Sequence, residues 1–129
     1  GVGMLEGILD LVPIAKVGFV GMQRDEETAM PVEYYKKLPT FHQDALYIVV
    51  DPMLATGGST IATLDLLKAG GVEKAIVICM VSCPEGITAV EQTHPDVQIY
   101  TAAVDERLNA KKYIVPGLGD AGDRLYGTI

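Results

Sequence analysis

The chain has 129 residues, of which 49% are hydrophobic and 21% charged, and it carries a formal net charge of −7 at pH 7. These values indicate one domain with a sizeable core over residues 1–129, although the length is short for a complete two-layer enzyme with a substrate hood. The acidic balance argues against a nucleic-acid-binding surface, and no apolar run reaches the ~18 residues of a membrane span.

The first segment predicts a core-facing helix. Apolar residues recur there at helical spacings until Pro13 stops the pattern: Met4, Leu5, Ile8, Leu9 and Val12. Gly1-Val2-Gly3 could form an anion-binding turn before this helix, but two glycines alone favour a plain cap. Because the chain begins without Met, we interpret it as a fragment lacking an N-terminal part.

Residues 16–21 predict a short buried strand, and residues 22–28 the polar loop at its end. Arg24 is the cation of this loop, beside three acids at 25–27. It could pair with one of those acids on the surface, as a lone loop arginine commonly does. At the end of a parallel strand, its guanidinium could instead offer two hydrogen bonds to a phosphate. Both interpretations stay open at this point.

Residues 29–43 alternate in side-chain type around Tyr34 and Tyr35 and contain Pro31 and Pro39. This pattern predicts an exposed β-arm or lid that covers the site or clasps a partner subunit. Paired tyrosines are commonly packing residues, so we assign the arm no catalytic residue.

The apolar run at 47–50 ends in Asp51 and opens into a loop of small residues. The run predicts a parallel strand covered on both faces, and ligands bind beyond the carboxyl ends of such strands. Two glycines and three hydroxyls beside the free amides of a helix start make phosphate the expected occupant. We expect a Cβ at Gly57 to intrude on that anion. The generic P-loop is excluded because no Lys follows the glycines, and Asp51 is placed to accept hydrogen bonds from sugar hydroxyls.

The run from Asp51 to Ser59 resembles the phosphoribosyl pyrophosphate loop of type I phosphoribosyltransferases, in its uracil phosphoribosyltransferase version. Most type I members have two adjacent acids where this chain has Asp51-Pro52. The resemblance implies that the loop holds the 5′-phosphate and that Asp51 is a catalytic residue on the ribose hydroxyls. It also carries a substrate-contacting role onto Arg24. The implied substrate-binding residues in this half are Arg24, Asp51, Pro52, Met53, Leu54, Ala55, Thr56, Gly57, Gly58 and Ser59.

The alternation of strand and helix patterns along the chain predicts a parallel sheet with right-handed crossovers. A helix is predicted from Ile61 to Gly70-Gly71, and a strand follows at 74–81. Ser82-Cys-Pro-Glu85 predicts the start of a second helix, which runs toward His94. A further strand is predicted at 97–104. With the resemblance, the fold class is α/β, a three-layer open parallel sheet of the type I phosphoribosyltransferase kind. Cys79 and Cys83 are expected to be buried free thiols, which fits a reducing cytoplasm.

The glycines and Pro116 of residues 113–128 predict a tight, non-helical backbone path with exposed amides and carbonyls. Such groups could read a nucleobase edge, or the segment could be a plain glycine-rich turn. The segment resembles the uracil-binding tail of the same family. The resemblance implies that the Ile114 backbone, Gly119, Asp120 and Ala121 bind uracil and that Asp120 is a second catalytic residue facing the ribose. Asp123 and Arg124 are expected to form a structural pair.

The resemblance implies an enzyme that converts uracil and phosphoribosyl pyrophosphate to UMP and diphosphate. It implies Mg²⁺ as cofactor, held mainly through substrate and water, and a homo-oligomer in the cytoplasm, and it leaves a GTP activator open. Neither nucleic acid nor a membrane is an expected partner. Two other hypotheses remain: a non-catalytic pyrimidine or nucleotide sensor on the same fold, and a fragment that only folds and oligomerises.

Overall fold

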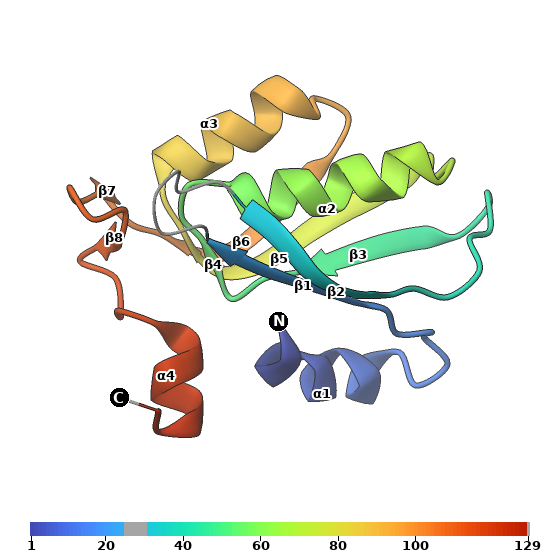
Figure 1. Cartoon of the computed structure of the whole chain (residues 1–129), viewed down its shortest axis with the longest axis horizontal. Helices are drawn as coiled ribbons and strands as arrows, with labels where there is room; N and C mark the ends of the chain where they lie inside the picture. Colours follow the sequence, from blue (N-terminus) through green and yellow to red (C-terminus); the bar gives the residue numbers. More distant parts are fainter. Residues whose placement is uncertain (25–30, 129) are drawn as a thin grey trace.

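The computed structural model describes residues 1–24 and 31–128 and contains a parallel sheet with β5 (Lys74–Ser82) at its centre. One edge of β5 pairs with β3 (Leu46–Val50) and then with β4 (Met53–Leu54), and the other pairs with β6 (Gln98–Val104). The crossovers α2 (Gly58–Ala69) and α3 (Pro84–Thr93) cover the same face of the sheet (Figure 1). The predicted α/β class with a parallel sheet is confirmed.

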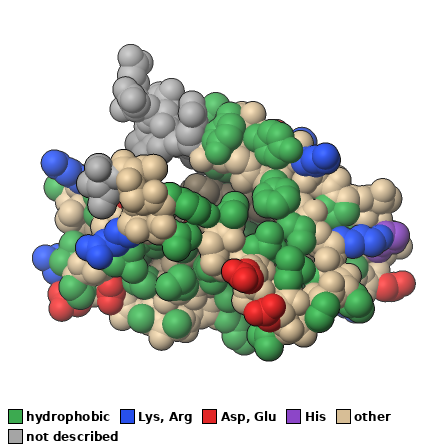
Figure 2. Space-filling model, turned by 90° about the horizontal axis from the view of Figure 1, so that it is seen from below, with side chains coloured by type: hydrophobic (Ala, Val, Ile, Leu, Met, Phe, Trp, Pro, Cys, Tyr) green, Lys and Arg blue, Asp and Glu red, His purple; other side chains and the backbone are tan. Residues whose placement is uncertain are grey.

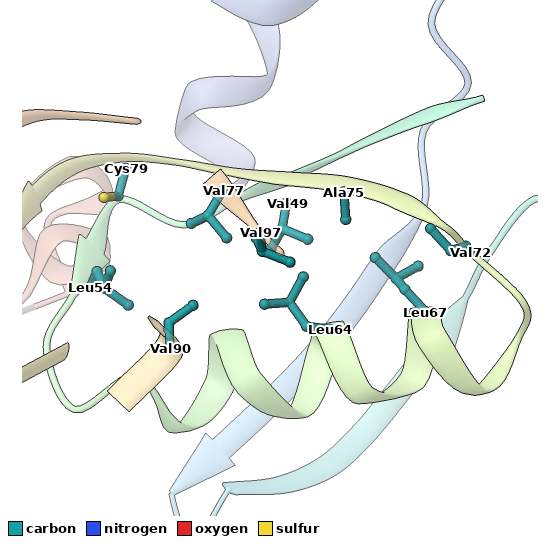
Figure 3. Packing of buried hydrophobic residues seen from close by; sticks show 10 residues of the cluster. All are labelled: Val49, Leu54, Leu64, Leu67, Val72, Ala75, Val77, Cys79, Val90 and Val97. Carbon is teal, nitrogen blue, oxygen red and sulfur yellow. The ribbon is translucent and has the colours of Figure 1, made fainter. Parts of the chain in front are cut away.

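The hydrophobic core lies between the sheet and these two helices (Figure 3). Leu64 of α2, Val77 of β5, Val90 of α3 and Leu54 of β4 are fully excluded from solvent. Burying an aliphatic side chain of this size contributes about 1.5–3 kcal/mol relative to leaving it exposed. Cys79 and Cys83 are buried free thiols, as predicted.

The opposite face of the sheet is only partly covered. Helix α1 (Val2–Leu11) lies on that side in Figure 1, but none of its residues is buried, so the prediction of a core-facing helix is wrong. Burial alternates along β3, where Val49 is buried and Ile48 is exposed, so the expected cover on both faces is also wrong. Figure 2 shows hydrophobic side chains spread across the face seen from below. Helix α1 is too short to cover this face of the sheet, so side chains of both α1 and β3 stay exposed there. This explains both errors.

The segment before the central loop forms a separate antiparallel pair. β1 (Phe19–Arg24) pairs with β2 (Pro31–Lys37), and neither strand joins the parallel sheet. The strand predicted at 16–21 is present but shifted to Phe19–Arg24, and its predicted burial is wrong, because Phe19 is 41% exposed. Residues 25–28 of the predicted polar loop lie outside the described residues. Tyr34 and Tyr35 on β2 are exposed, and a lid or clasp there stays a prediction.

The C-terminal segment forms a second antiparallel pair, β7 (Arg107–Leu108) with β8 (Ile114–Val115), followed by α4 (Ala121–Tyr126). The prediction that this segment is not helical is wrong. Asp120 caps α4 by accepting a hydrogen bond from the Asp123 amide at 2.9 Å, and Gly127 ends the helix with φ 67°. Within the described chain, the Asp123 carboxylate accepts from the Thr128 hydroxyl and does not pair with Arg124.

No helix among residues 1–24 and 31–128 combines the length and apolar character that a bilayer crossing requires.

Candidate active site

A break between β3 and β4 places Asp51 at the edge of the sheet. The Asp51 amide still bonds the Ile78 carbonyl at 3.1 Å, but Pro52 has no N–H to continue the ladder. The Pro52 carbonyl instead accepts from the amides of both Met80 and Val81, each at 3.1 Å. The chain therefore leaves β3, pairs again briefly as β4, and turns into the loop at the carboxyl end of the strand.

The loop ends at the N-terminus of α2. Gly57 is the N-cap residue of α2, with φ 82°, and has no side chain with which to cap the helix. Thr56 Oγ1 accepts from the Gly58 amide at 3.4 Å, which tightens the turn. Uncapped amides and the helix dipole favour an anion at this place.

The loop encloses a cavity of about 70 Å³, lined by Asp51 and by residues 53–60. One water molecule needs on the order of 10–15 Å³ of such space, so this hollow has room for a small group such as a phosphate. The predicted substrate-binding residues 51–59 lie around this cavity with two exceptions, and their binding role stays a prediction. Pro52 does not line the cavity, and the Leu54 side chain is buried in the core, so Leu54 offers only its backbone.

Gly57 serves the packing of the loop. A Cβ at Gly57 would lie 3.2 Å from the Gly86 carbonyl oxygen and 3.3 Å from the Ala89 Cβ, both on α3. Its missing side chain therefore gives room to α3, and the expectation that a Cβ there would intrude on the anion stays a prediction.

Burial raises the pKa of the Asp51 carboxyl above its ordinary value. A hydrogen bond from the Met53 amide and one from the Thr60 hydroxyl partly oppose that rise. The Met53 amide donates to Oδ1 of Asp51 at 3.2 Å. An ionised Asp51 is thus costly in the absence of a ligand, and a donor such as a sugar hydroxyl would relieve that cost.

The predicted base-binding residues lie on the C-terminal segment. Ile114 is 3% exposed, so its side chain packs inside and only its backbone is available to a ligand. Gly119 has φ 78°, and the nearest atom to a Cβ there would be Arg124 Nε at 4.0 Å. Asp120 is exposed and uses Oδ1 as the α4 cap, and Ala121 begins that helix. These four residues do not line the loop cavity, so they would form a separate half of the candidate site, and their role in base binding stays a prediction.

Arg24 does not occupy the predicted position at the end of a parallel strand. It ends β1 opposite Pro31 in the antiparallel pair, and its side chain falls outside the described part of the structure. Its substrate contact stays a prediction.

Sequence reasoning missed the contacts that support the loop. Thr60 is 2% exposed and helps to hold down the pKa of Asp51. Cys83, Glu85 and Gly86 contact the loop or the C-terminal segment from the first turn of α3. The only signal in the sequence was Ser82-Cys-Pro-Glu85, which predicts a helix start and says nothing of what that start contacts.

A larger hollow of about 450 Å³ runs along α1, lined by Val2, Leu5, Glu6, Leu9, Asp10 and Pro13. Its charged groups are two carboxylates, which repel a phosphate, so it is a poor candidate for the anion site.

Comparison with known proteins identifies the family to which the chain is similar. The family model described as "Uracil phosphoribosyltransferase" matches residues 1–128. A uracil phosphoribosyltransferase of Alkaliphilus metalliredigens is 63% identical over 128 residues, covering 99% of this chain and 61% of the relative. The chain thus spans about three fifths of the length of the curated relatives it matches.

Two solved structures extend the comparison to the fold. A protein of Aquifex aeolicus superposes with a TM-score of 0.90 at 45% identity, over 95% of this chain and 58% of that one. A purine phosphoribosyltransferase of Pyrococcus horikoshii shares the fold at 14% identity, with a TM-score of 0.58 over 82% of this chain and 68% of that one. From the family match over nearly the whole chain and the close curated relatives, the chain belongs to the uracil phosphoribosyltransferase family.

Proposed function

We propose that the protein transfers the phosphoribosyl group of phosphoribosyl pyrophosphate to uracil, giving UMP and diphosphate. The observation that carries the proposal is the cavity at the α2 N-terminus, with Asp51 at its rim, in a chain that matches this family throughout. Relatives at about 60% identity bear the name of this activity.

In the proposed mechanism, the loop amides bind the 5′-phosphate and Asp51 accepts hydrogen bonds from the ribose hydroxyls. The backbone of Ile114 and of residues 119–121 reads the uracil edge. Asp120 would face the ribose with Oδ2, since Oδ1 is used in the α4 cap. A uracil nitrogen then displaces diphosphate at the anomeric carbon through an oxocarbenium-like state, with Arg24 as a further substrate contact. Positioning and charge stabilisation are sufficient for such a transfer without a covalent protein intermediate.

Mg²⁺ fits the donor set around the loop. One carboxylate, that of Asp51, lines the cavity beside hydroxyls and amides. Mg²⁺ in such sites keeps several waters and is held by one or two carboxylates and by substrate phosphates. The ion would therefore be carried mainly by diphosphate and ribose oxygens, and when bound it would neutralise charge on the leaving diphosphate.

The assembly and location proposed with this function rest on weaker features. The apolar side chains exposed on the sheet face opposite α2 and α3 support a homo-oligomer. The buried free thiols of Cys79 and Cys83 support a reducing compartment such as the cytoplasm. Activation by GTP stays a prediction of the family resemblance.

The test is incubation of isotope-labelled uracil with phosphoribosyl pyrophosphate and Mg²⁺, using this chain and a version extended to the length of its relatives. Labelled UMP is the expected product, and cytosine in excess should not compete. Base discrimination follows because cytosine presents an amino donor where uracil presents a carbonyl acceptor. Tight UMP binding by both proteins without turnover would contradict the proposal and favour the non-catalytic sensor.

A further inference from the structure

The first turn of α3 contacts both halves of the candidate site. On the loop side, the Cys83 amide donates to the Leu54 carbonyl at 3.3 Å and the Cys83 thiol donates to the Ala55 carbonyl at 3.2 Å. A Cβ at Gly86 would lie 2.4 Å from the Ala55 carbonyl oxygen. Glycine is therefore required for this approach, and the helix start rests directly on the loop backbone.

On the other side, the same turn holds the C-terminal segment through Glu85. Glu85 Oε1 accepts a hydrogen bond from the Leu108 amide at 2.8 Å. Leu108 is on β7 and pairs with Ile114 of β8, the residue whose backbone is proposed to read uracil. The Leu108 amide holds the pKa of the Glu85 carboxyl below its ordinary value, so the group is ionised near neutral pH.

Two further bonds place this segment against the sheet. The Asp105 amide donates to the Ser82 carbonyl at 2.8 Å, and the Gly117 amide donates to Asp105 Oδ2 at 2.9 Å. These bonds fix the two ends of the β7–β8 unit. Glu85 provides a side-chain contact between the unit and α3, and its bond to Leu108 joins residues 23 positions apart in the sequence.

We propose that Glu85 is a positioning residue that sets the spacing between the loop at 51–60 and the base-recognition segment at 114–121. The inference rests on the proposed function, because only a ligand with a phosphate and a base joined through one sugar has to match that spacing. A nucleotide has a fixed reach between its phosphate and its base, so a displaced base segment loses contacts that a phosphate alone never makes. Glu85 touches neither group in this scheme and acts through Leu108.

The experiment uses three substitutions of Glu85 and a matched control. Glu85→Gln keeps the reach and loses the charge, Glu85→Asp keeps the charge and loses the reach, and Glu85→Ala loses both. Glu91→Ala is the control, since Glu91 is exposed on the same helix and its side chain has no hydrogen bond among the described residues. Glu85 lies in the first turn of α3, so the Gln and Asp variants also separate a helix-dipole effect from the loss of the Leu108 bond.

Calorimetry with UMP and with ribose 5-phosphate is the first measurement. Loss of the bond should weaken UMP binding by roughly three- to tenfold in the Ala and Asp variants. Ribose 5-phosphate lacks the base and would meet the segment only through Asp120, so its affinity should fall less than that of UMP. The Gln variant and Glu91→Ala should bind both ligands like the unmodified protein. Hydrogen exchange is the second measurement, and the Leu108 amide should exchange faster in the Ala and Asp variants only.

The other outcomes overturn either the positioning role of Glu85 or the proposed function. Equal UMP affinity in the unmodified protein and in Glu85→Ala overturns the positioning role, and so does an equal loss for UMP and ribose 5-phosphate, which indicates general damage. If Glu85→Ala does not fold, the Asp and Gln pair gives the same comparison. Failure of the unmodified protein to bind UMP overturns the proposed function, and this inference with it.

Discussion

The side chain of Asp51 is subject to two opposing requirements, the stability of the unliganded fold and the binding of a ligand. Its carboxylate is partly buried at the end of β3, and burial is the largest cause that raises its pKa. The same position lets it face a ligand from the rim of the loop cavity. A residue that serves binding at a cost to the stability of the unliganded fold is a common feature of functional sites, and substitution can separate the two effects.

Asp51→Asn should weaken ligand binding and stabilise the fold at neutral pH. Loss of a charge-assisted acceptor should cost about 1.5–3 kcal/mol in phosphoribosyl pyrophosphate binding, measured by calorimetry. Because the pKa of Asp51 is raised in the folded state, the stabilisation from its protonation is complete below the ordinary carboxyl pKa and is lost as the pH rises through the raised value. The melting temperature of the variant should therefore exceed that of the unmodified protein at pH 7.

The advantage of Asp51→Asn should shrink on acidification and vanish below about pH 4, where the carboxyl is protonated in both states. A variant less stable at pH 7 would contradict the assigned cost of burial. Unchanged ligand affinity would show that Asp51 only orients the Met53 amide.

At the scale of elements, local sequence signals predicted segments whose neighbours are also local. The strands at 47–50, 74–81 and 97–104 and the helix start at Ser82–Glu85 are present because runs rich in β-branched residues and a Pro near a helix start specify them without distant partners. The partner of the strand predicted at 16–21 could not be predicted in this way, since the same apolar run suits a parallel or an antiparallel neighbour. Helix α4 was not predicted because the glycines of this segment indicated a loop. In the structure, Asp120 caps the start of a short helix and Gly127 ends it.

The candidate site likewise has a part that the sequence could predict and a part that it could not. The cavity from Asp51 to Thr60 could be predicted because it is one continuous strand, loop and helix start. The contacts of Cys83, Glu85 and Gly86 could not, because they join α3 to segments 23 or more residues away. Sequence spacing carries no direct information on such tertiary contacts.

Gly57→Ala should destabilise the fold more than Gly71→Ala, although both glycines have left-handed backbone. Gly57 has φ 82° and Gly71 has φ 87°, but a Cβ at Gly57 would meet α3 at 3.2 Å and a Cβ at Gly71 would meet nothing within 4 Å. The backbone cost, about 1–2 kcal/mol for a non-glycine residue, is therefore common to both. Crowding against α3 should add about 1 kcal/mol or more at position 57.

Urea unfolding of the two variants beside the unmodified protein measures this difference. Equal losses would show that α3 gives way without cost, and the packing role assigned to Gly57 would then be wrong.

At the scale of the whole molecule, the two faces of the sheet differ. The face under α2 and α3 carries the core, whereas the other face leaves large apolar side chains exposed, among them Leu46, Ile48, Met80 and Tyr100. The sequence could not reveal this asymmetry, because a continuous apolar strand looks the same whether one or both of its faces are covered. Stability should therefore be concentrated on one side of the sheet.

Hydrogen exchange should show that asymmetry directly. Amides of β5 bond neighbours on both edges, and Ala75, Val77 and Cys79 are buried, so they should exchange only when the whole domain unfolds. Helices α1 and α4 have no buried residue and should exchange by local opening, with much lower protection. Low concentrations of urea should speed exchange in β5, because global unfolding exposes a large surface, and should leave exchange in α1 nearly unchanged. The measurement needs two protein concentrations, because self-association through the uncovered face would protect α1 in a concentration-dependent way. Protection of α1 equal to that of β5 at both concentrations would contradict a core that lies only under α2 and α3.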